Sequence, residues 1–386
     1  MPLVLTGVVI GVVLLLLIAV VSVLYVPSLR RVAIEKGVVV AAEKTGMDID
    51  LDSLYLSPFH HSPMVLYRAW KGQGDLPLEV RIDSLFVGHR GQDTLVYVRH
   101  LRLKATVHTL SSAPHQPKDL LSLPIEVEHL LLDKTTFHSG PLIATVGVDV
   151  VLRLLETSSP ALSIAEGRYP LHGLRIYDTF VGIDLRPSPK PAKPKTEKKN
   201  PLRLAFDVPG GDLRNIHFLL TPLGLDIRTR TLQPDVLVDV GGNTYDAHRL
   251  EVGGYRMTIG KFYLPLDTVH GDACVALDKH LITSNGLHAR SDEIGAQIDL
   301  TSAAMNLEEM RVDVDGDAMY KGSKAQLKGY YDINDEAYDV HAEVERVDLT
   351  ALMHDSTYVL IAGELNAKGK GINPRSRAMR SKVQLH

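Results

Sequence analysis

Residues 338–345 read YDVHAEVE, and this short stretch decides the fold class. Four apolar residues alternate in it with four polar ones, in the order Tyr338, Asp339, Val340, His341, Ala342, Glu343, Val344 and Glu345. Successive side chains of a β-strand point to opposite faces. This period of two therefore predicts a strand with one face in water and one face against apolar material.

The same period recurs along the chain from residue 47 onward, in about 18 segments separated by Gly, Pro, Asn and Asp turns. Clear examples are residues 47–52, 78–83, 101–108, 202–208 and 311–315. Helical stretches are expected to be few and short, at residues 118–121, 152–156 and 349–353. Long helices between the strands would indicate a parallel α/β sheet, and they are lacking. The sequence predicts an all-β fold of antiparallel meanders, with a sandwich, a barrel or an open curved sheet as the alternatives.

The amino terminus predicts a membrane anchor. Residues 1–29 contain no charged side chain, and residues 3–26 are almost entirely apolar. As a helix this run would extend roughly 36 Å, against a hydrocarbon core of about 30 Å. A cleaved signal peptide is the alternative, but it requires a basic residue before a shorter apolar run. We expect an uncleaved transmembrane segment at residues 1–28, followed by a short helix at residues 29–46.

Two features of the sequence predict opposite orientations of this anchor in the membrane. Arg30, Arg31 and Lys36 follow the apolar run, whereas no basic side chain precedes it. Positive-inside counting alone would place the body of the chain in the cytoplasm. The resemblance described below predicts the opposite orientation, with the body in the periplasm.

Residues 186–200 interrupt the strand rhythm with RPSPKPAKPKTEKKN, in which Glu197 is the single acidic residue. Such a segment favours extended polyproline II and cannot bury apolar surface. Three interpretations are open. It is a linker between domains, a solvated hairpin loop between residues 180–185 and 202–208, or a recognition peptide or patch for anionic lipid.

Composition excludes several classes of partner and fold. The formal net charge of −4 gives no basic field for nucleic acid, so we expect no nucleic-acid partner. Cys274 is the single cysteine, which excludes an intrachain disulfide and a cysteine-rich metal site. The low content of tryptophan, Trp70 alone, is unusual for a carbohydrate-processing cleft.

A search for catalytic and metal-binding patterns gives no candidate. His60 and His61 are adjacent but lack the accompanying ligands of a zinc site. Asp313, Asp315 and Asp317 have the spacing of a calcium loop for only three positions, without its glycine and distal glutamate. No Gly-rich phosphate loop and no nucleophile elbow occur in the sequence. We expect no enzyme activity, no cofactor and no metal, and the 17 histidines are expected on solvated strand faces.

The order of the segments resembles a known family. VPSLRR at residues 26–31 follows the apolar run, KTG at residues 44–46 ends the short helix, and a strand covers residues 47–56. GQDTL at residues 91–95 and VDLTAL at residues 347–352 continue the order. Over almost its whole length the chain resembles the AsmA-like, repeating β-groove family of the Gram-negative envelope, and within it the amino-terminal part of TamB-like translocation and assembly module proteins.

This resemblance implies an inner-membrane protein with one span, at residues 3–26, and a body in the periplasm. The body, residues 47–367, would be an extended antiparallel, taco-like β-groove lined with apolar side chains. Its implied role is outer-membrane biogenesis, by phospholipid transport between membranes and by assembly and secretion of outer-membrane proteins such as autotransporters. The implied partners are phospholipid acyl chains and an Omp85-type outer-membrane protein, the latter through a C-terminal region missing from this chain. Residues 368–386 are expected to be an irregular, strandless tail of a truncated piece.

The predicted groove has candidate lining residues on two strands. We expect the lipid-facing side chains to include Leu101, Leu103, Val107, Val340, Ala342 and Val344. The alternative hypothesis is a structural or adhesive β-sandwich on a membrane anchor, in which the same residues close a core. An open apolar row exposes more apolar surface than a soluble monomer tolerates and so implies an apolar ligand.

Overall fold

The chain is all-β in the residues that the computed structural model describes, which confirms the predicted fold class. These residues are 47–57, 61, 63–71, 74–89, 94–108, 125–139, 146–163, 167–185, 204–221, 224–239, 242, 244–259, 262–321, 323–348, 360–371 and 380–385. The chain divides into two compact units, Met1–Asp226 and Ile227–His386. Each unit is described by itself below.

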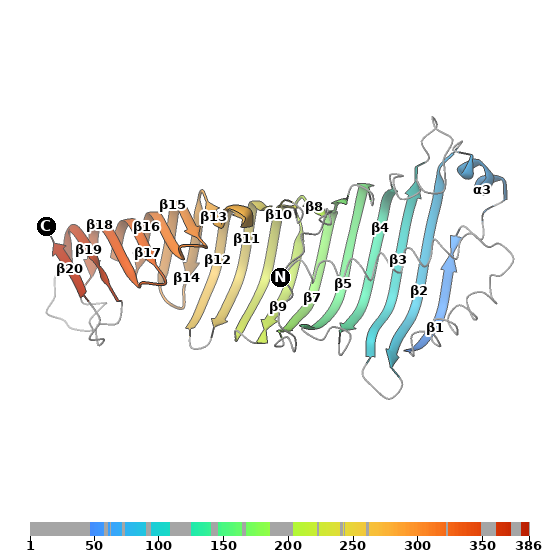
Figure 1. Ribbon diagram of the computed structural model, residues 1–386, viewed down its shortest axis with the longest axis horizontal. Coiled ribbons are helices and arrows are strands. Elements are labelled where there is room, and N and C mark those ends of the chain that lie inside the picture. The colour runs from blue at the N-terminus through green and yellow to red at the C-terminus, as the bar shows by residue number, and fades with distance from the viewer. Residues whose placement is uncertain are drawn as a thin grey trace, which may run out of the picture. The chain divides into compact units, whose positions relative to one another are not determined.

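The first unit is built on an antiparallel meander (Figure 1). Neighbouring strands pair in chain order, and they are β1 (Met47–Leu56), β2 (Leu76–His89), β3 (Thr94–Val107), β4 (Ile125–His138), β5 (Val146–Leu162) and β7 (His172–Leu185). A short helix, α3 (Pro63–Trp70), precedes β2 and was not predicted. Its sequence signal is the dipeptide Ser-Pro at residues 62–63, because proline is favoured at the first helical position.

Two parallel pairings end the first unit. Strand β6 (Arg168–Pro170) pairs with β8 (Ala205–Val208), and β7 pairs with β9 (Asp212–Leu220). The rings of Tyr169 and Phe206 stack with centroids 5.3 Å apart, and both side chains are buried. The hairpin between residues 180–185 and 202–208, one of the three interpretations, is therefore wrong, because β7 pairs with β5 and β9 while β8 pairs with β6. Residues 186–200 themselves lie outside the described residues.

The second unit is also a meander of antiparallel strands. Its strands are β11 (Thr244–Ile259), β12 (Phe262–Ala276), β13 (Leu281–Ser284), β14 (Leu287–Ser291), β15 (Ala296–Asn306), β16 (Arg311–Tyr320), β17 (Ser323–Asp332), β18 (Ala337–Asp348), β19 (Leu360–Lys370) and β20 (Arg380–Leu385). The short strands β13 and β14 share their neighbours, β12 on one side and β15 on the other. Strand β10 (Leu225–Asp239) crosses the boundary between the units.

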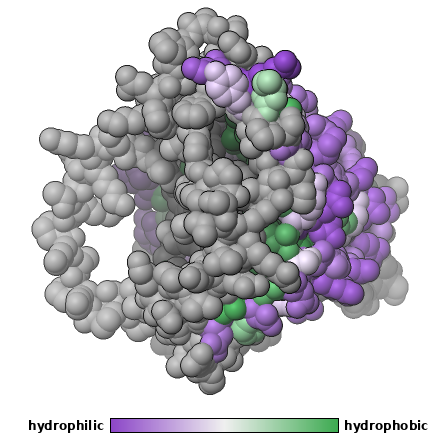
Figure 2. Space-filling view, turned by 90° about the vertical axis from the view of Figure 1, so that its right-hand side faces the viewer, coloured by the Kyte–Doolittle hydropathy of each residue, from purple (hydrophilic) through white to green (hydrophobic). Residues whose placement is uncertain are grey.

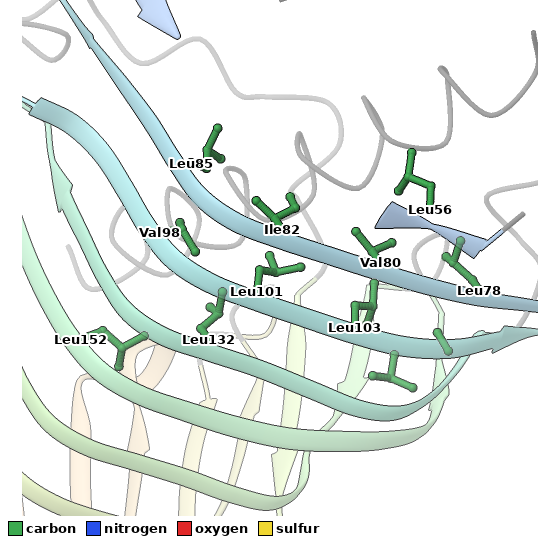
Figure 3. Packing of buried hydrophobic residues seen from close by; sticks show 12 residues of the cluster. Leu56, Leu78, Val80, Ile82, Leu85, Val98, Leu101, Leu103, Leu132 and Leu152 are labelled. Carbon is green, nitrogen blue, oxygen red and sulfur yellow. The ribbon is translucent and has the colours of Figure 1, made fainter. Parts of the chain in front are cut away.

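The core of the first unit is a cluster of side chains on one face of its sheet (Figure 3). It consists of Leu56, Leu78, Val80, Ile82, Leu85, Val98, Leu101, Leu103, Ala105, Val127, Leu132 and Leu152. Burying a leucine or valine side chain contributes about 1.5–3 kcal/mol. The cluster therefore fixes which face of β1 to β5 is apolar, because a register slip of one residue would put polar side chains there.

A line of matched breaks crosses the strands of the first unit. In β2 and β3, Asp83 pairs with His100 and Leu85 pairs with Val98, while Ser84 and the residue opposite it are left out of the ladder. The register is the same on both sides of the break. Equivalent breaks occur in the pairs β1–β2, β3–β4, β4–β5, β5–β7 and β7–β9. We call this line the crease, and it consists of Asp52, Ser84, Arg99, Lys134, Arg153, Asp178 and Asn215.

Two expectations about secondary structure are wrong. Residues 152–156, expected as a helix, belong to β5 because their neighbours on both sides alternate and pair with β4 and β7. The tail at residues 368–386, expected to lack strands, contains the end of β19 and all of β20. Val383 and Leu385 alternate with Lys382 and Gln384 there, which lets β20 extend the sheet beside β19.

Several other expectations fall on residues outside the described part of the chain. These are the transmembrane segment at residues 3–26, the helix at residues 29–46 and the short helices at residues 118–121 and 349–353. Of the helices in the described ranges, none has both the length and the apolar character needed to cross a bilayer.

Candidate functional site

The candidate site in the second unit is the apolar face of β16, β17 and β18. Val314 on β16 lies opposite Gly329 on β17, and Gly329 lies opposite Val340 on β18. One step along the strands, Val312, Tyr331 and Tyr338 form a second row in the same register. The alternation of residues 338–345 thus repeats across the sheet and forms a continuous apolar surface.

A hollow of about 300 Å³ lies on these strands. It is lined by Val312, Val314, Tyr330, Tyr331, Tyr338 and Val340. Its position follows from Gly329, which contributes no side chain between Val314 and Val340. A Cβ atom at Gly329 would stand 2.3 Å from the carbonyl oxygen of Asp339, so this gap cannot be filled without moving the backbone of β18.

The apolar face of the second unit is only partly shielded from water. Val340 and Val344 are half-buried, whereas Ala342 between them is 3% exposed. On the opposite face of β18, His341 and Glu343 are exposed. The exposure of His341 and Glu343 agrees with the predicted polar face, whereas Asp339 is half-buried like Val340. Ala342 is buried, as are Pro234 and Pro265 elsewhere in the second unit.

The candidate lining residues on β3 have a different environment. Leu101 and Leu103 are 8% and 6% exposed and belong to the closed cluster of the first unit. Val107, at the end of the same strand, is half-buried. The structure therefore brings the six predicted residues together in two groups of three, one on β3 and one on β18. Both groups have the same alternation of apolar and polar residues in the sequence. This alternation does not show whether the apolar side chains are fully buried or partly exposed.

The opposite face of each unit carries pairs of charged side chains on neighbouring strands. In the second unit Lys368 Nζ lies 2.6 Å from Asp339 Oδ2, and Lys328 Nζ lies 3.0 Å from Asp315 Oδ2. The hydrogen bond to Asp339 raises the pKa of Lys368. In the view of the first unit in Figure 2, hydrophilic side chains gather along one side, with hydrophobic ones next to them on the inner side. Such pairs add little stability at an exposed surface, but they fix which face is wet.

Asp83 on β2 contacts polar side chains on both neighbouring strands. Its carboxylate accepts hydrogen bonds from Arg102 at 2.7 Å and Ser53 at 2.9 Å, and it lies 2.8 Å from His100 Nδ1. The Arg102 hydrogen bond, followed by those of His100 and Ser53, lowers the pKa of Asp83 to about 2. These partners come from β1 and β3, so the carboxylate ties three strands together rather than facing a cleft.

Histidines on the strands serve as cross-strand partners of acids. His129 Nε2 lies 3.0 Å from Glu156, and His288 Nδ1 lies 2.6 Å from Asp299. His61 lies 3.1 Å from the carbonyl oxygen of Pro77, and His60 lies outside the described residues. No group of three or more metal-ligating side chains occurs among the residues that the structure describes.

The aspartates of β16 are also engaged by neighbouring cations. Arg311 donates to Asp313 at 2.7 Å, and Lys328 pairs with Asp315. Asp317 lies opposite Asp299 on β15 and Gln326 on β17. These acids therefore belong to the charged face of the sheet.

Sequence reasoning missed the crease. Its signal is an interruption of the period of two, where two polar residues separate two apolar ones that share a face. Ile82 and Leu85 on β2 are both buried in the core cluster, as are Val98 and Leu101 on β3. The motif occurs as LDSL at residues 51–54, IDSL at 82–85, VRHL at 98–101 and LRNI at 213–216. The other strands of the crease depart from it, with LDKT at 132–135, LRLL at 152–155 and IYDT at 176–179.

Comparison of the chain with protein-family models, with curated proteins and with solved structures found no match.

Proposed function

We propose that the chain is a membrane-anchored protein of the cell envelope whose apolar β-face holds and guides phospholipid acyl chains. The observation that carries the proposal is the half-exposed apolar row of β16 to β18 with its hollow beside Val340. Acyl chains are unbranched and apolar, so they suit a row of valines, small residues and tyrosine rings that contains no charged side chain.

The proposal includes the location that the sequence predicts. Residues 3–26 anchor the chain in the inner membrane, and the body lies in the periplasm as an extended, taco-like groove. In this setting the apolar face conducts phospholipid between membranes, assists the assembly and secretion of outer-membrane proteins, or does both. The support for this part is the resemblance of the sequence to the AsmA-like, repeating β-groove family. No catalytic group, metal or cofactor takes part in the proposed role.

The second candidate function is a structural or adhesive β-protein on a membrane anchor. The observation that favours it is the closed packing of the first unit, where Leu101 and Leu103 are almost fully buried. A closed core has no room for a ligand and would hold the strands as a rigid support.

Phospholipid bound to the purified protein distinguishes the two functions. The full chain is extracted from membranes in a mild detergent, and its lipids are quantified by mass spectrometry against an unrelated single-span protein prepared in the same way. We expect at least one phospholipid per chain beyond the control. Lipid at the level of the control would support the structural role instead.

A further inference from the structure

The crease is more than an irregularity of the sheet, because it changes the face to which the strand presents its side chains. Ile82 and Leu85 are 5% and 7% exposed and lie on the same face, so Asp83 and Ser84 between them both turn to the polar face. A strand in which two successive side chains point to the same face is longer on that face. The strand therefore bends so that its apolar face lies on the concave side. Figure 3 shows this bend in β2 between Ile82 and Leu85.

The backbone at the crease takes an unusual conformation on four of its seven strands, namely β2, β4, β7 and β9. Ser84, Lys134, Asp178 and Asn215 have φ of 54°, 48°, 50° and 53°. Residues other than glycine adopt the left-handed region rarely and at a cost of about 1–3 kcal/mol, so a change of conformation at these positions would relieve backbone strain. Each of these residues can therefore change conformation without breaking a ladder pair, because it forms none.

The hydrogen bonds that join Arg153, Asp178 and Asn215 run along the crease and not across it. Asp178 accepts from Arg153 on one neighbouring strand and from Asn215 on the other, both at 2.7 Å. Bonds in this direction keep adjacent strands aligned at the crease. They do not join the two halves of a strand, so they do not resist a change in the bend angle.

We propose that the crease is a hinge line, about which the two halves of the first unit's sheet swing to open and close over their apolar face. The matched register on both sides of every break lets all strands bend at the same line, so the two halves move as two plates. A change of 20° in the bend would move a point about 17 Å from the crease, five residues along a strand, by roughly 6 Å. This inference does not depend on which ligand, if any, the apolar face takes.

The test measures a distance across the crease in the full chain. Spin labels are placed at Val151 and Pro160, which are exposed residues of β5 on either side of Arg153, after replacement of the free Cys274 by serine. The control pair is Gln326 and Asp332 on β17, between which the register is unbroken with both β16 and β18. Pulsed electron paramagnetic resonance in detergent micelles then gives the distribution of each distance.

We expect the distribution for the β5 pair to be wider than that for the β17 pair by about 1 Å, because labels about 7 and 23 Å from the crease change their separation by that amount when the bend changes by 20°. Labelled proteins with an unchanged melting temperature establish that the labels leave the fold intact. A β5 distribution as narrow as the control would overturn the hinge and leave the crease as a fixed bend. Bound phospholipid is measured on the same samples, so a failed hinge and a failed lipid proposal remain separate results.

Discussion

A charge placed on the apolar row of β18 should abolish lipid transfer at a small cost in folding. Val340 is half-buried, so Val340→Asp removes about half of the 1.5 kcal/mol that full burial of a valine contributes. The lower strand propensity of aspartate adds up to about 1 kcal/mol. We therefore expect a loss of about 2 kcal/mol in the free energy of unfolding, because water still reaches the carboxylate. An acyl chain passing this site would displace that water, at a cost of several kcal/mol.

The measurement is transfer of a fluorescent phospholipid from donor to acceptor vesicles by the purified chain, with denaturant unfolding in parallel. A barrier of several kcal/mol corresponds to a loss of more than tenfold in the transfer rate, since 1.4 kcal/mol is a factor of ten. The matched control is His341→Asp, on the exposed face of the same strand, for which we expect less than a twofold change. Equal rates for the wild type and Val340→Asp, or an equal loss in both variants, would refute the reasoning.

Three further predictions concern the first unit. Lys134→Gly should stabilise the fold by about 0.5–1 kcal/mol in denaturant unfolding, because φ is 48° there, whereas Arg99→Gly on the opposite strand should destabilise it. Hydrogen bonds to Asp75 and Glu126 raise the pKa of His108 above 6.5. The protonated imidazole should therefore stabilise the fold fully below pH 6.5, and this stabilisation should fall as the pH rises. The measurement is the difference in melting temperature between the wild type and His108→Gln. Trypsin should cut within residues 186–203, and the fragments should coelute on gel filtration because β7 pairs with β9; separation would indicate an interdomain linker.

The period of two predicted the fold class and the faces of individual strands. It succeeded for β18 because Val340, Ala342 and Val344 lie on one face while His341 and Glu343 face water. A strand with one wet face must alternate in this way wherever it lies in a sheet. The face of a strand is thus a local property, and one sequence is enough to read it.

The sequence pattern did not predict which strands pair with one another. The parallel pairing of β7 with β9 depends on the path of the chain between them and on the small buried cluster around Tyr169 and Phe206. Periodicity is identical for parallel and antiparallel partners of a half-buried strand. The hairpin interpretation of residues 180–208 was wrong for this reason.

The difference between the two groups of candidate lining residues was also beyond the sequence. Leu103 and Val340 occupy equivalent places in strands of the same pattern, yet Leu103 is 6% exposed and Val340 is half-buried. Exposure is decided by what packs over a row, and that is a property of the tertiary structure. The crease, by contrast, was present in the sequence as a pair of polar residues between apolar ones in β1, β2, β3 and β9.

Photo-crosslinking in the native membrane tests the central claim most directly. A photoreactive amino acid is introduced at Val340 or Val344, and in matched variants at His341 or Glu343, which lie on the opposite face of β18. We expect phospholipid to be captured from the valine positions and not from the exposed ones. Equal capture from both faces, or none from either face of the folded protein, would contradict the account of the apolar face as a path for acyl chains.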